Sequence, residues 1–293
     1  MNAPDGSPPG LWRLFLETLT GRRPVETSGP LLNAFLGMPG PVRDLVRWLL
    51  RPRRRFLFGR LRALADDRVM SGPFRGMRLA GYPAAPELLG CYERELFPVV
   101  QELASGSFDR VINVGARYGY YAIGFARLLP AVPVIAFEAE TEARRTLAGA
   151  AAANGVADRV RVRGYCDVAD LIAALAEGTR PLLVCDIEGG EMTLLDPARV
   201  SALRNATILV ECHGSPASST ELTMAARFLP SHQLRRVATE GRVLAQLPEG
   251  VAEPWRSRMP RTTEALMQEN RTVPQSWLLL TPRASSAPHP SAP

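Results

Sequence analysis

Lysine is absent from this chain, and all 35 of its basic residues are arginine. Without lysine the protein has no Schiff-base residue, no lysine general base and no lysine for a phosphate-binding loop. Cysteine is scarce, the C-x-x-C spacing of zinc and redox sites is missing, and most of the cysteines lie in or beside predicted buried strands. We therefore expect reduced core thiols of a cytoplasmic protein at Cys91, Cys166, Cys185 and Cys212.

Long apolar runs are also missing, so the sequence predicts no transmembrane segment. Residues 1–6 lack the charged start and the apolar stretch of a secretory signal. A hydrophobic fraction of 46% and a length of 293 residues are typical of one globular domain with an extension. We expect a helical, arginine-rich extension with a disordered start over residues 1–70, a main domain over 71–283 and a disordered tail over 284–293.

Positive charge is concentrated in the extension. The segment from Arg43 to Arg62 carries eight arginines and a single acid, Asp44, so the rest of a chain with net charge +6 is close to neutral. Arginines interleaved with apolar side chains would fit a phosphate backbone or an anionic lipid surface. They also fit a helix that packs its apolar stripe on the main domain, and we favour this second interpretation.

From Arg110 onwards, short apolar runs alternate with helical patterns, as in βαβ units with a parallel sheet. We predict strands over 110–114, 132–137, 159–163, 181–186, 206–212, 233–238 and 276–280. We predict helices over 119–129, 141–153, 168–176, 191–203 and 218–229, with another near 262–270. A hairpin over 71–79 and a helix over 87–104 would precede this sheet. The predicted fold class is α/β, a Rossmann-like, seven-stranded, mostly parallel sheet with helices on both faces.

A glycine-punctuated turn follows the first of these strands. It has the pattern G-x-x-x-G at Gly115 and Gly119, and the next strand ends in an acid, Glu138. A strand, turn, helix, strand and acid in this order bind an adenosine-containing cofactor, with the acid on the ribose hydroxyls. The nicotinamide fingerprint needs glycine where this chain has Arg117 and Tyr120, which argues against an oxidoreductase. The tighter turn favours a ligand with an amino-acid tail, S-adenosylmethionine.

Acidic residues follow the fourth strand, and a histidine follows the fifth. Asp186 and Glu188 come directly after a buried run, while Glu191 fits a simpler role in starting the next helix. Glu211 and His213 share one face of their strand and would lie near these acids. A histidine there serves as general base or metal ligand, or else caps the following turn.

Asp167 follows the third predicted strand, and two interpretations of it stay open. Its carboxylate would accept a hydrogen bond from the adenine amino group, or it would cap the helix that begins at Val168.

Together these motifs resemble the FkbM-type branch of class I S-adenosylmethionine-dependent methyltransferases over roughly residues 71–283. The matching pieces are Asn113-Val114-Gly115-Ala116 with Gly119-Tyr120, Phe137-Glu138, Asp186-Ile187-Glu188-Gly189 with Glu191, and Val210-Glu211 with His213. The most specific is the D-x-E-G-x-E element at Asp186. The resemblance implies cofactor contacts from Asn113, Gly115, Ala116, Gly119, Tyr120, Glu138, Asp167 and Asp186.

Two positions depart from the family pattern. The family usually has Asp where this chain has Asn113, so a charge near the methionine amine is lost. Arg117 takes a position that is more often small or Asn-like, where it would crowd the pocket or reach for an anionic substrate.

The implied activity is O-methylation of a hydroxyl on a small molecule or glycan, with His213, Glu188 and Asp186 as the catalytic residues. No spacing demands a metal and none is predicted, although Asp186, Glu211 and His213 would be the ligands of a divalent ion. An RNA methyltransferase guided by the basic segment is a weaker alternative, because the Asn/Asp-Pro-Pro-aromatic signature after the fourth strand is missing. A third hypothesis is a non-catalytic cofactor-binding module that docks on a partner or membrane.

Overall fold

The computed structural model describes residues 56–283 apart from 57, 82, 214–219, 250, 252, 259 and 270–274. Its strands are β1 (Arg110–Val114), β2 (Val134–Phe137), β3 (Val160–Arg163), β4 (Pro181–Cys185), β5 (Thr207–Cys212), β6 (His232–Ala238) and β7 (Ser276–Pro282). The α-helices are α4 (Ala85–Leu89), α5 (Phe97–Ala104), α6 (Tyr120–Leu128), α7 (Thr141–Ala153), α8 (Val168–Ala176), α9 (Glu191–Leu194), α10 (Thr220–Phe228), α11 (Glu253–Ser257) and α12 (Pro260–Met267). A further helix covers residues 58–65, and short 3₁₀ helices lie at Arg94–Leu96, Ser201–Asn205 and Leu244–Gln246.

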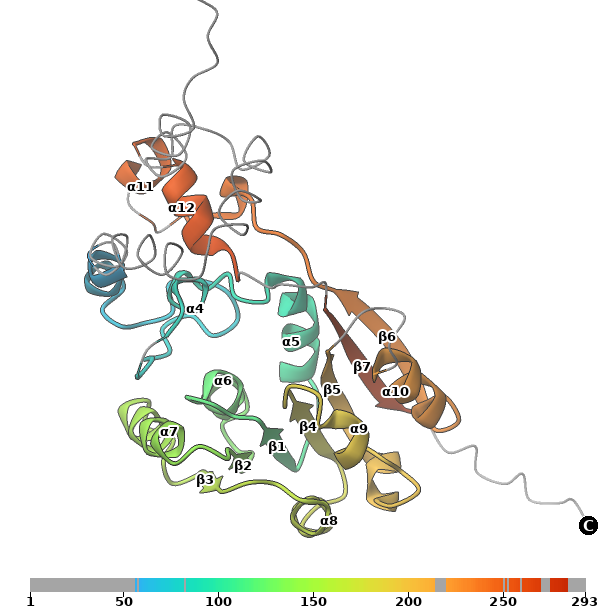
Figure 1. Ribbon diagram of the computed structural model, residues 1–293. Coiled ribbons are helices and arrows are strands. Elements are labelled where there is room, and N and C mark those ends of the chain that lie inside the picture. Colours follow the sequence, from blue (N-terminus) through green and yellow to red (C-terminus); the bar gives the residue numbers. More distant parts are fainter. Residues whose placement is uncertain are drawn as a thin grey trace, which may run out of the picture.

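All seven strands form one sheet in the order β3-β2-β1-β4-β5-β7-β6 (Figure 1). Strands β1 to β5 are parallel to one another, and β7 runs antiparallel to both β5 and β6. The chain builds outward from β1 to β3 and then returns to β4 on the other side of β1. Such a reversal opens a crevice beside the carboxyl ends of β1 and β4, where ligands of open α/β sheets bind.

Helices cover both faces of the sheet, and β1 and β4 are therefore buried along their whole length. One core layer joins the sheet to α5, α6 and α7. A second core layer joins the opposite face to α8, α9 and α10. The predicted fold class is therefore confirmed, and each predicted strand is present with its ends shifted by two residues or fewer.

A third apolar cluster lies away from the sheet. It unites the helix over 58–65, α4, α11 and α12, which gather at one end of the molecule in Figure 1. Leu61 and Met267 have no exposed surface in this cluster. The described end of the arginine-rich segment thus packs apolar side chains against α4, α11 and α12. The rest of that segment lies outside the described residues.

The prediction of one continuous helix over 87–104 is wrong. α4 ends at Leu89, and Gly90 follows in the left-handed conformation at φ 71°. A Cβ on Gly90 would lie 2.2 Å from the carbonyl oxygen of Ser71, so the chain turns where only glycine fits. The separate helix α5 then begins at Phe97, and Pro98 lies in its first turn, where a missing N–H costs nothing.

Two other predicted elements differ from the structure. The helix predicted over 191–203 ends at Leu194, because Pro197 lacks an amide hydrogen and disfavours helical backbone at the residue before it. The structure has no hairpin over the described residues 71–79. An isolated β-bridge between Arg68 and Arg78 stands in its place. The predicted core thiols are confirmed, since all four cysteines are free and buried. Among the described helices, none has the length and apolar character needed to cross a bilayer.

Candidate active site

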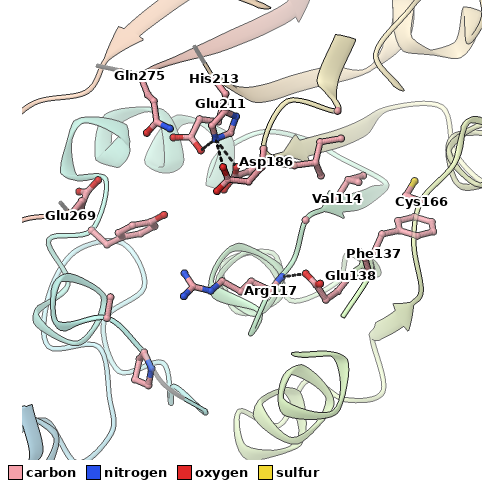
Figure 2. A pocket seen from close by; sticks show the side chains of 18 of the residues that line it. Val114, Arg117, Phe137, Glu138, Cys166, Asp186, Glu211, His213, Glu269 and Gln275 are labelled. Atoms are coloured by element: carbon pink, nitrogen blue, oxygen red, sulfur yellow. Dashed lines mark hydrogen bonds and ion pairs between the residues drawn. The ribbon is translucent and has the colours of Figure 1, made fainter. Parts of the chain in front are cut away.

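A cavity of about 1290 Å³ lies where the carboxyl ends of β1, β2, β4 and β5 meet (Figure 2). Its near wall follows these strand ends, from Gly115 and Glu138 to Asp186 and His213. The opposite wall comes from the residues before α4, from Tyr92 and from the end of α12. The volume exceeds the several hundred Å³ of a typical one-ligand pocket, so there is room for a cofactor and a second molecule.

The glycine turn after β1 is fixed by close backbone contacts. Gly115 has a φ of 80°, and a Cβ there would lie 1.7 Å from the carbonyl oxygen of Asp186. The amides of Gly115 and Ala116 both donate to the carbonyl oxygen of Phe137, at 3.0 and 2.9 Å. These amides therefore form hydrogen bonds within the protein and are unavailable to a phosphate group.

Glu138 lies at the end of β2, and both of its oxygens accept backbone hydrogen bonds. The amide of Arg117 donates to one oxygen at 2.7 Å, and the amide of Glu140 donates to the other at 2.8 Å. The carboxylate is thus held at the cavity, as Figure 2 shows, and each oxygen keeps a second lone pair for a hydroxyl donor.

Several predicted cofactor residues lie behind the cavity wall. Asn113 is 2% exposed and donates from Nδ2 to the carbonyl oxygen of Val184 at 3.3 Å. Ala116 is buried, and Gly119 precedes α6. Tyr120 points into an aromatic group, with its ring 5.2 Å from that of Tyr92. None of these four line the cavity among the described residues.

Asp167 lies at the cavity and also caps α8. One of its oxygens accepts from the amide of Asp170 at 2.8 Å, and the Asp170 side chain accepts from the amide of Asp167 at 3.2 Å. The capping interpretation is therefore confirmed. The neighbouring Tyr165, three-quarters exposed, lines the same part of the cavity.

Acids surround His213 at the ends of β4 and β5 (Figure 2). Its Nδ1 lies 3.0 Å from Oε1 of Glu191. Its Nε2 lies 3.2 Å from Glu211, 3.5 Å from Asp186 and 3.9 Å from Glu188. The structure thus brings together the three residues predicted as catalytic, and adds Glu191 and Glu211 to them.

Burial and charge shift the protonation of this cluster. Burial raises the pKa of Asp186 well above its usual value, and the nearby Glu211 raises it further. Hydrogen bonds to Glu191 and Glu211 raise the pKa of His213 to about 10. Burial alone would raise the pKa of Glu191, but hydrogen bonds from His213 and from backbone amides hold it below its usual value. These contacts favour the protonated form of His213, in which both nitrogens donate.

Donor atoms of Asp186, Glu211 and His213 lie within 4.8 Å of one another, close enough to share one divalent ion. A histidine that binds a metal must give up the proton on the binding nitrogen. The carboxylates around His213 favour the opposite, protonated form. Metal binding by Asp186, Glu211 and His213 would therefore require His213 to release the proton that its carboxylate neighbours favour.

Sequence reasoning gave Glu191 only a role in starting α9. Its carboxylate has no exposed surface and turns back to His213 and to the amide of Ile187, at 3.2 Å. The available signal was the spacing: Glu191 follows Asp186 by five residues across a Gly-Gly turn, which folds the chain back on itself.

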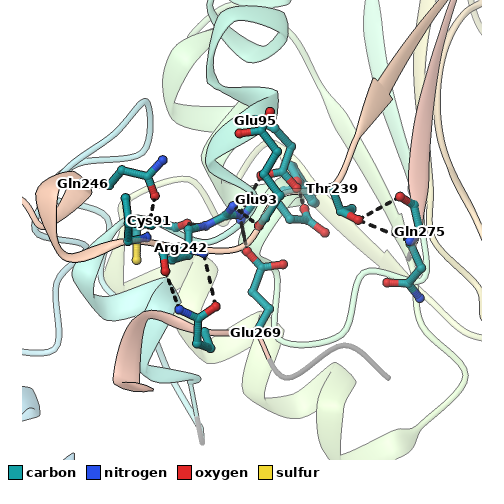
Figure 3. Close-up of polar contacts among 12 residues, drawn as sticks. Cys91, Glu93, Glu95, Thr239, Arg242, Gln246, Glu269 and Gln275 are labelled. Atoms are coloured by element: carbon teal, nitrogen blue, oxygen red, sulfur yellow. Dashed lines mark hydrogen bonds and ion pairs between the residues drawn. The ribbon is translucent and has the colours of Figure 1, made fainter. Parts of the chain in front are cut away.

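Arg242 fixes the opposite wall of the cavity (Figure 3). This buried guanidinium lies 2.6 Å from Glu95, pairs with Glu269 and donates to the carbonyl oxygen of Cys91 at 2.9 Å. Glu269 in turn accepts from the amide of Glu93 at 2.8 Å and lines the cavity. No sequence motif pointed to Arg242, because its partners are distant in the chain.

No protein-family model matches the chain, and no curated protein matches it. Solved structures of similar fold include the delta-N METTL16 methyltransferase domain, which is 14% identical, with 70% of this chain and 89% of that chain covered and a TM-score of 0.45. The human methyltransferase 10 domain containing protein is 14% identical, with 70% and 88% covered and a TM-score of 0.44. The O-methyltransferase TomG from Streptomyces achromogenes, in complex with S-adenosylmethionine, is 17% identical, with 69% and 92% covered and a TM-score of 0.41. Likeness at this level carries no argument about what this chain binds or which reaction it catalyses.

Proposed function

We propose that this chain is an S-adenosylmethionine-dependent methyltransferase that acts on a hydroxyl group of a small molecule or sugar. One observation carries the proposal: the glycine turn after β1, Glu138 after β2 and the acids after β4 and β5 all open into one cavity at the reversal of strand order. The finer assignment to the FkbM-type branch rests on the sequence motifs, and so does the cytoplasmic location.

In this proposal Glu138 accepts from the ribose hydroxyls, Asp167 meets the adenine end, and Asp186 faces the methionine amine and the reacting methyl group. Gly115 provides the close backbone surface under the ligand. The amides of Gly115, Ala116 and Arg117 are all used internally, which supports a cofactor without a pyrophosphate. The remaining residues of the predicted set shape the turn from behind: Asn113, Ala116, Gly119 and Tyr120.

Bound S-adenosylmethionine would supply an electrophilic methyl group for the acceptor oxygen, and its sulfur would keep the electron pair of the broken carbon–sulfur bond as a thioether. The hydroxyl proton must go to a base. We assign that role to Asp186, because its raised pKa suits a proton acceptor and it lines the cavity. His213, charged, holds the carboxylates in place, and Glu188, largely exposed, faces the entering acceptor.

Charge in the cavity supports a small, uncharged acceptor over RNA. Among the described lining residues, Arg117 is the only arginine. The acidic lining residues are Glu138, Asp167, Asp186, Glu188, Glu211 and Glu269. Such a surface repels a phosphate backbone. If the RNA alternative holds, filter binding to RNA must show tight binding that weakens steeply with salt.

Calorimetric titration with S-adenosylhomocysteine tests the proposal. We expect micromolar binding by the wild type and at least a roughly tenfold loss in Glu138→Ala, since a charge-assisted hydrogen bond is removed. Glu140→Ala is the matched control: it deletes the neighbouring exposed acid, which does not line the cavity. No binding by a folded wild type would refute the assignment. Normal cofactor binding without turnover over a broad hydroxyl panel would favour the non-catalytic module.

A further inference from the structure

Arg117 brings a positive charge to the candidate cofactor site. Among the residues that the structure describes, no carboxylate forms an ion pair with its guanidinium, which lies 5.2 Å from the centre of the Tyr118 ring. Glu87 shares a small neighbouring pocket with Arg117, but the Glu87 carboxylate is buried and accepts from the amide of Ala84 at 2.5 Å. The described part of the protein therefore leaves this charge without an ionic partner.

We propose that Arg117 binds the carboxylate at the methionine end of the cofactor and so selects for ligands that carry this group. The inference rests on the proposed function and deepens it. The methionine end carries an amine and a carboxylate, and the proposed function pairs only the amine, with Asp186. A guanidinium suits the carboxylate, because it can donate two parallel hydrogen bonds to it.

Elimination among the basic side chains leads to Arg117. The chain contains no lysine, and Arg117 is the only arginine among the described residues that line the cavity. His213 also lines the cavity, but carboxylates already face both of its nitrogens. Glu191 lies at Nδ1, and Glu211 and Asp186 lie at Nε2. These acids would repel a further carboxylate, which leaves Arg117 as its partner.

The turn after β1 places Arg117 between the two carboxylates proposed to hold the cofactor. Its amide donates to Glu138, the proposed ribose acceptor, at 2.7 Å. Gly115, in the same turn, lies so close to the carbonyl oxygen of Asp186 that a Cβ would approach it to 1.7 Å. Figure 2 shows the Arg117 side chain extending away from Glu138. The guanidinium thus leaves the ribose position, as does the methionine end of the cofactor.

The backbone of Arg117 gives an independent reason to assign its side chain a role. Its φ of 47° lies in the left-handed region, which glycine adopts at lower cost. The contact with Glu138 uses only the amide, so glycine would supply it equally well. Strained backbone of this kind is concentrated at functional sites. A contribution from the guanidinium explains why arginine stands here.

Calorimetry with two ligands tests the proposal. The ligands are S-adenosylhomocysteine and its decarboxylated analogue, which keeps the adenosine, the thioether and the amine. We expect the wild type to bind the analogue at least about tenfold more weakly, because it loses a charge-assisted contact. Arg117→Met should bind S-adenosylhomocysteine at least about tenfold more weakly than the wild type does, and should distinguish the two ligands by less than about threefold.

Arg145→Met is the matched control. It removes an exposed arginine of α7 that pairs with Glu142 and does not line the cavity, so both affinities should stay within about twofold of the wild type. Arg117→Lys keeps the charge without the planar fork and should retain part of the preference for the carboxylate. Thermal melting of each variant checks that it is folded.

Each of three results would overturn the proposal while the wild type still binds S-adenosylhomocysteine. Equal affinity of the wild type for the two ligands would exclude a cation at the carboxylate, and this comparison needs no variant to fold. Equal weakening of both ligands in Arg117→Met would mark a structural effect on the turn. Unchanged binding in Arg117→Met would leave the guanidinium for an anionic group of the acceptor. No binding of S-adenosylhomocysteine by the wild type would instead refute the proposed function itself.

Discussion

Arg117 holds a backbone conformation that favours glycine, with a φ of 47°. Its amide fixes Glu138, while its guanidinium lies 5.2 Å from the centre of the Tyr118 ring. The backbone amide of Arg117 thus holds Glu138 in the candidate cofactor site, independently of the Arg117 side chain. The strain that accompanies it should be measurable.

We predict that Arg117→Gly raises the free energy of unfolding by about 0.5–1 kcal/mol, since glycine adopts this φ without a Cβ clash. Chemical denaturation measures the change. Arg117→Ala removes the same charge but keeps a Cβ, so it should give no gain. Equal effects of the two substitutions would trace the change to charge instead of backbone strain.

The His213 cluster should make stability fall at alkaline pH. The pKa of His213 is raised from 6.5 to about 10, so the folded state binds its proton more tightly than the unfolded state does. This stabilisation is complete below about pH 6.5 and is lost as the pH rises towards 10. Melting temperatures over that window should decline for the wild type and change less for His213→Gln.

At the scale of elements, Asp167 belongs to the capping box that begins α8, and substitution can separate this capping from its proposed contact with the adenine end of the cofactor. Asp167→Ala should cost about 1 kcal/mol of stability through the lost cap. Asp167→Asn should keep that stability, because asparagine also caps helices, and should weaken S-adenosylhomocysteine binding if the charge matters. Thermal melting and calorimetry on the same samples distinguish the two. Normal binding by both variants would remove Asp167 from the cofactor site.

The strands were predictable because buried parallel strands are continuous apolar runs, as in Leu182–Cys185. The break in the predicted helix over 87–104 was not predictable. The apolar spacing persists across Gly90, where contact with Ser71 forces a turn. The sequence likewise located Glu138, Asp186 and His213, which follow strand ends. It missed the contact between Glu191 and His213, because the direction of the Glu191 side chain depends on the turn that precedes it.

At the scale of the whole molecule, the opposite cavity wall depends on contacts between distant segments. Arg242 and Cys91 are 151 residues apart in the chain, and such a pairing leaves no local pattern. The structure places Leu266, Gln268 and Glu269, at and after the end of α12, on the cavity wall, and buried Arg242 pairs with Glu269.

We predict that Arg242→Met lowers the free energy of unfolding by about 3–5 kcal/mol, because Glu95 and Glu269 would remain buried without their cation. The control is Arg235→Met, which breaks the half-exposed pair with Glu102 and should cost less than about 1 kcal/mol. Urea denaturation compares the two. Adding Glu95→Gln to Arg242→Met should recover part of the loss, and no recovery would argue against the charge-based explanation.

The sheet order has a consequence for synthesis on the ribosome. β7 is the last strand of the sheet in sequence, yet it lies between β5 and β6 and pairs with both. Until residues 276–282 emerge, the apolar strand Thr207–Cys212 has an open edge, a template for pairing with other chains. A nascent or truncated chain that stops before Ser276 should therefore depend on chaperones and aggregate without them.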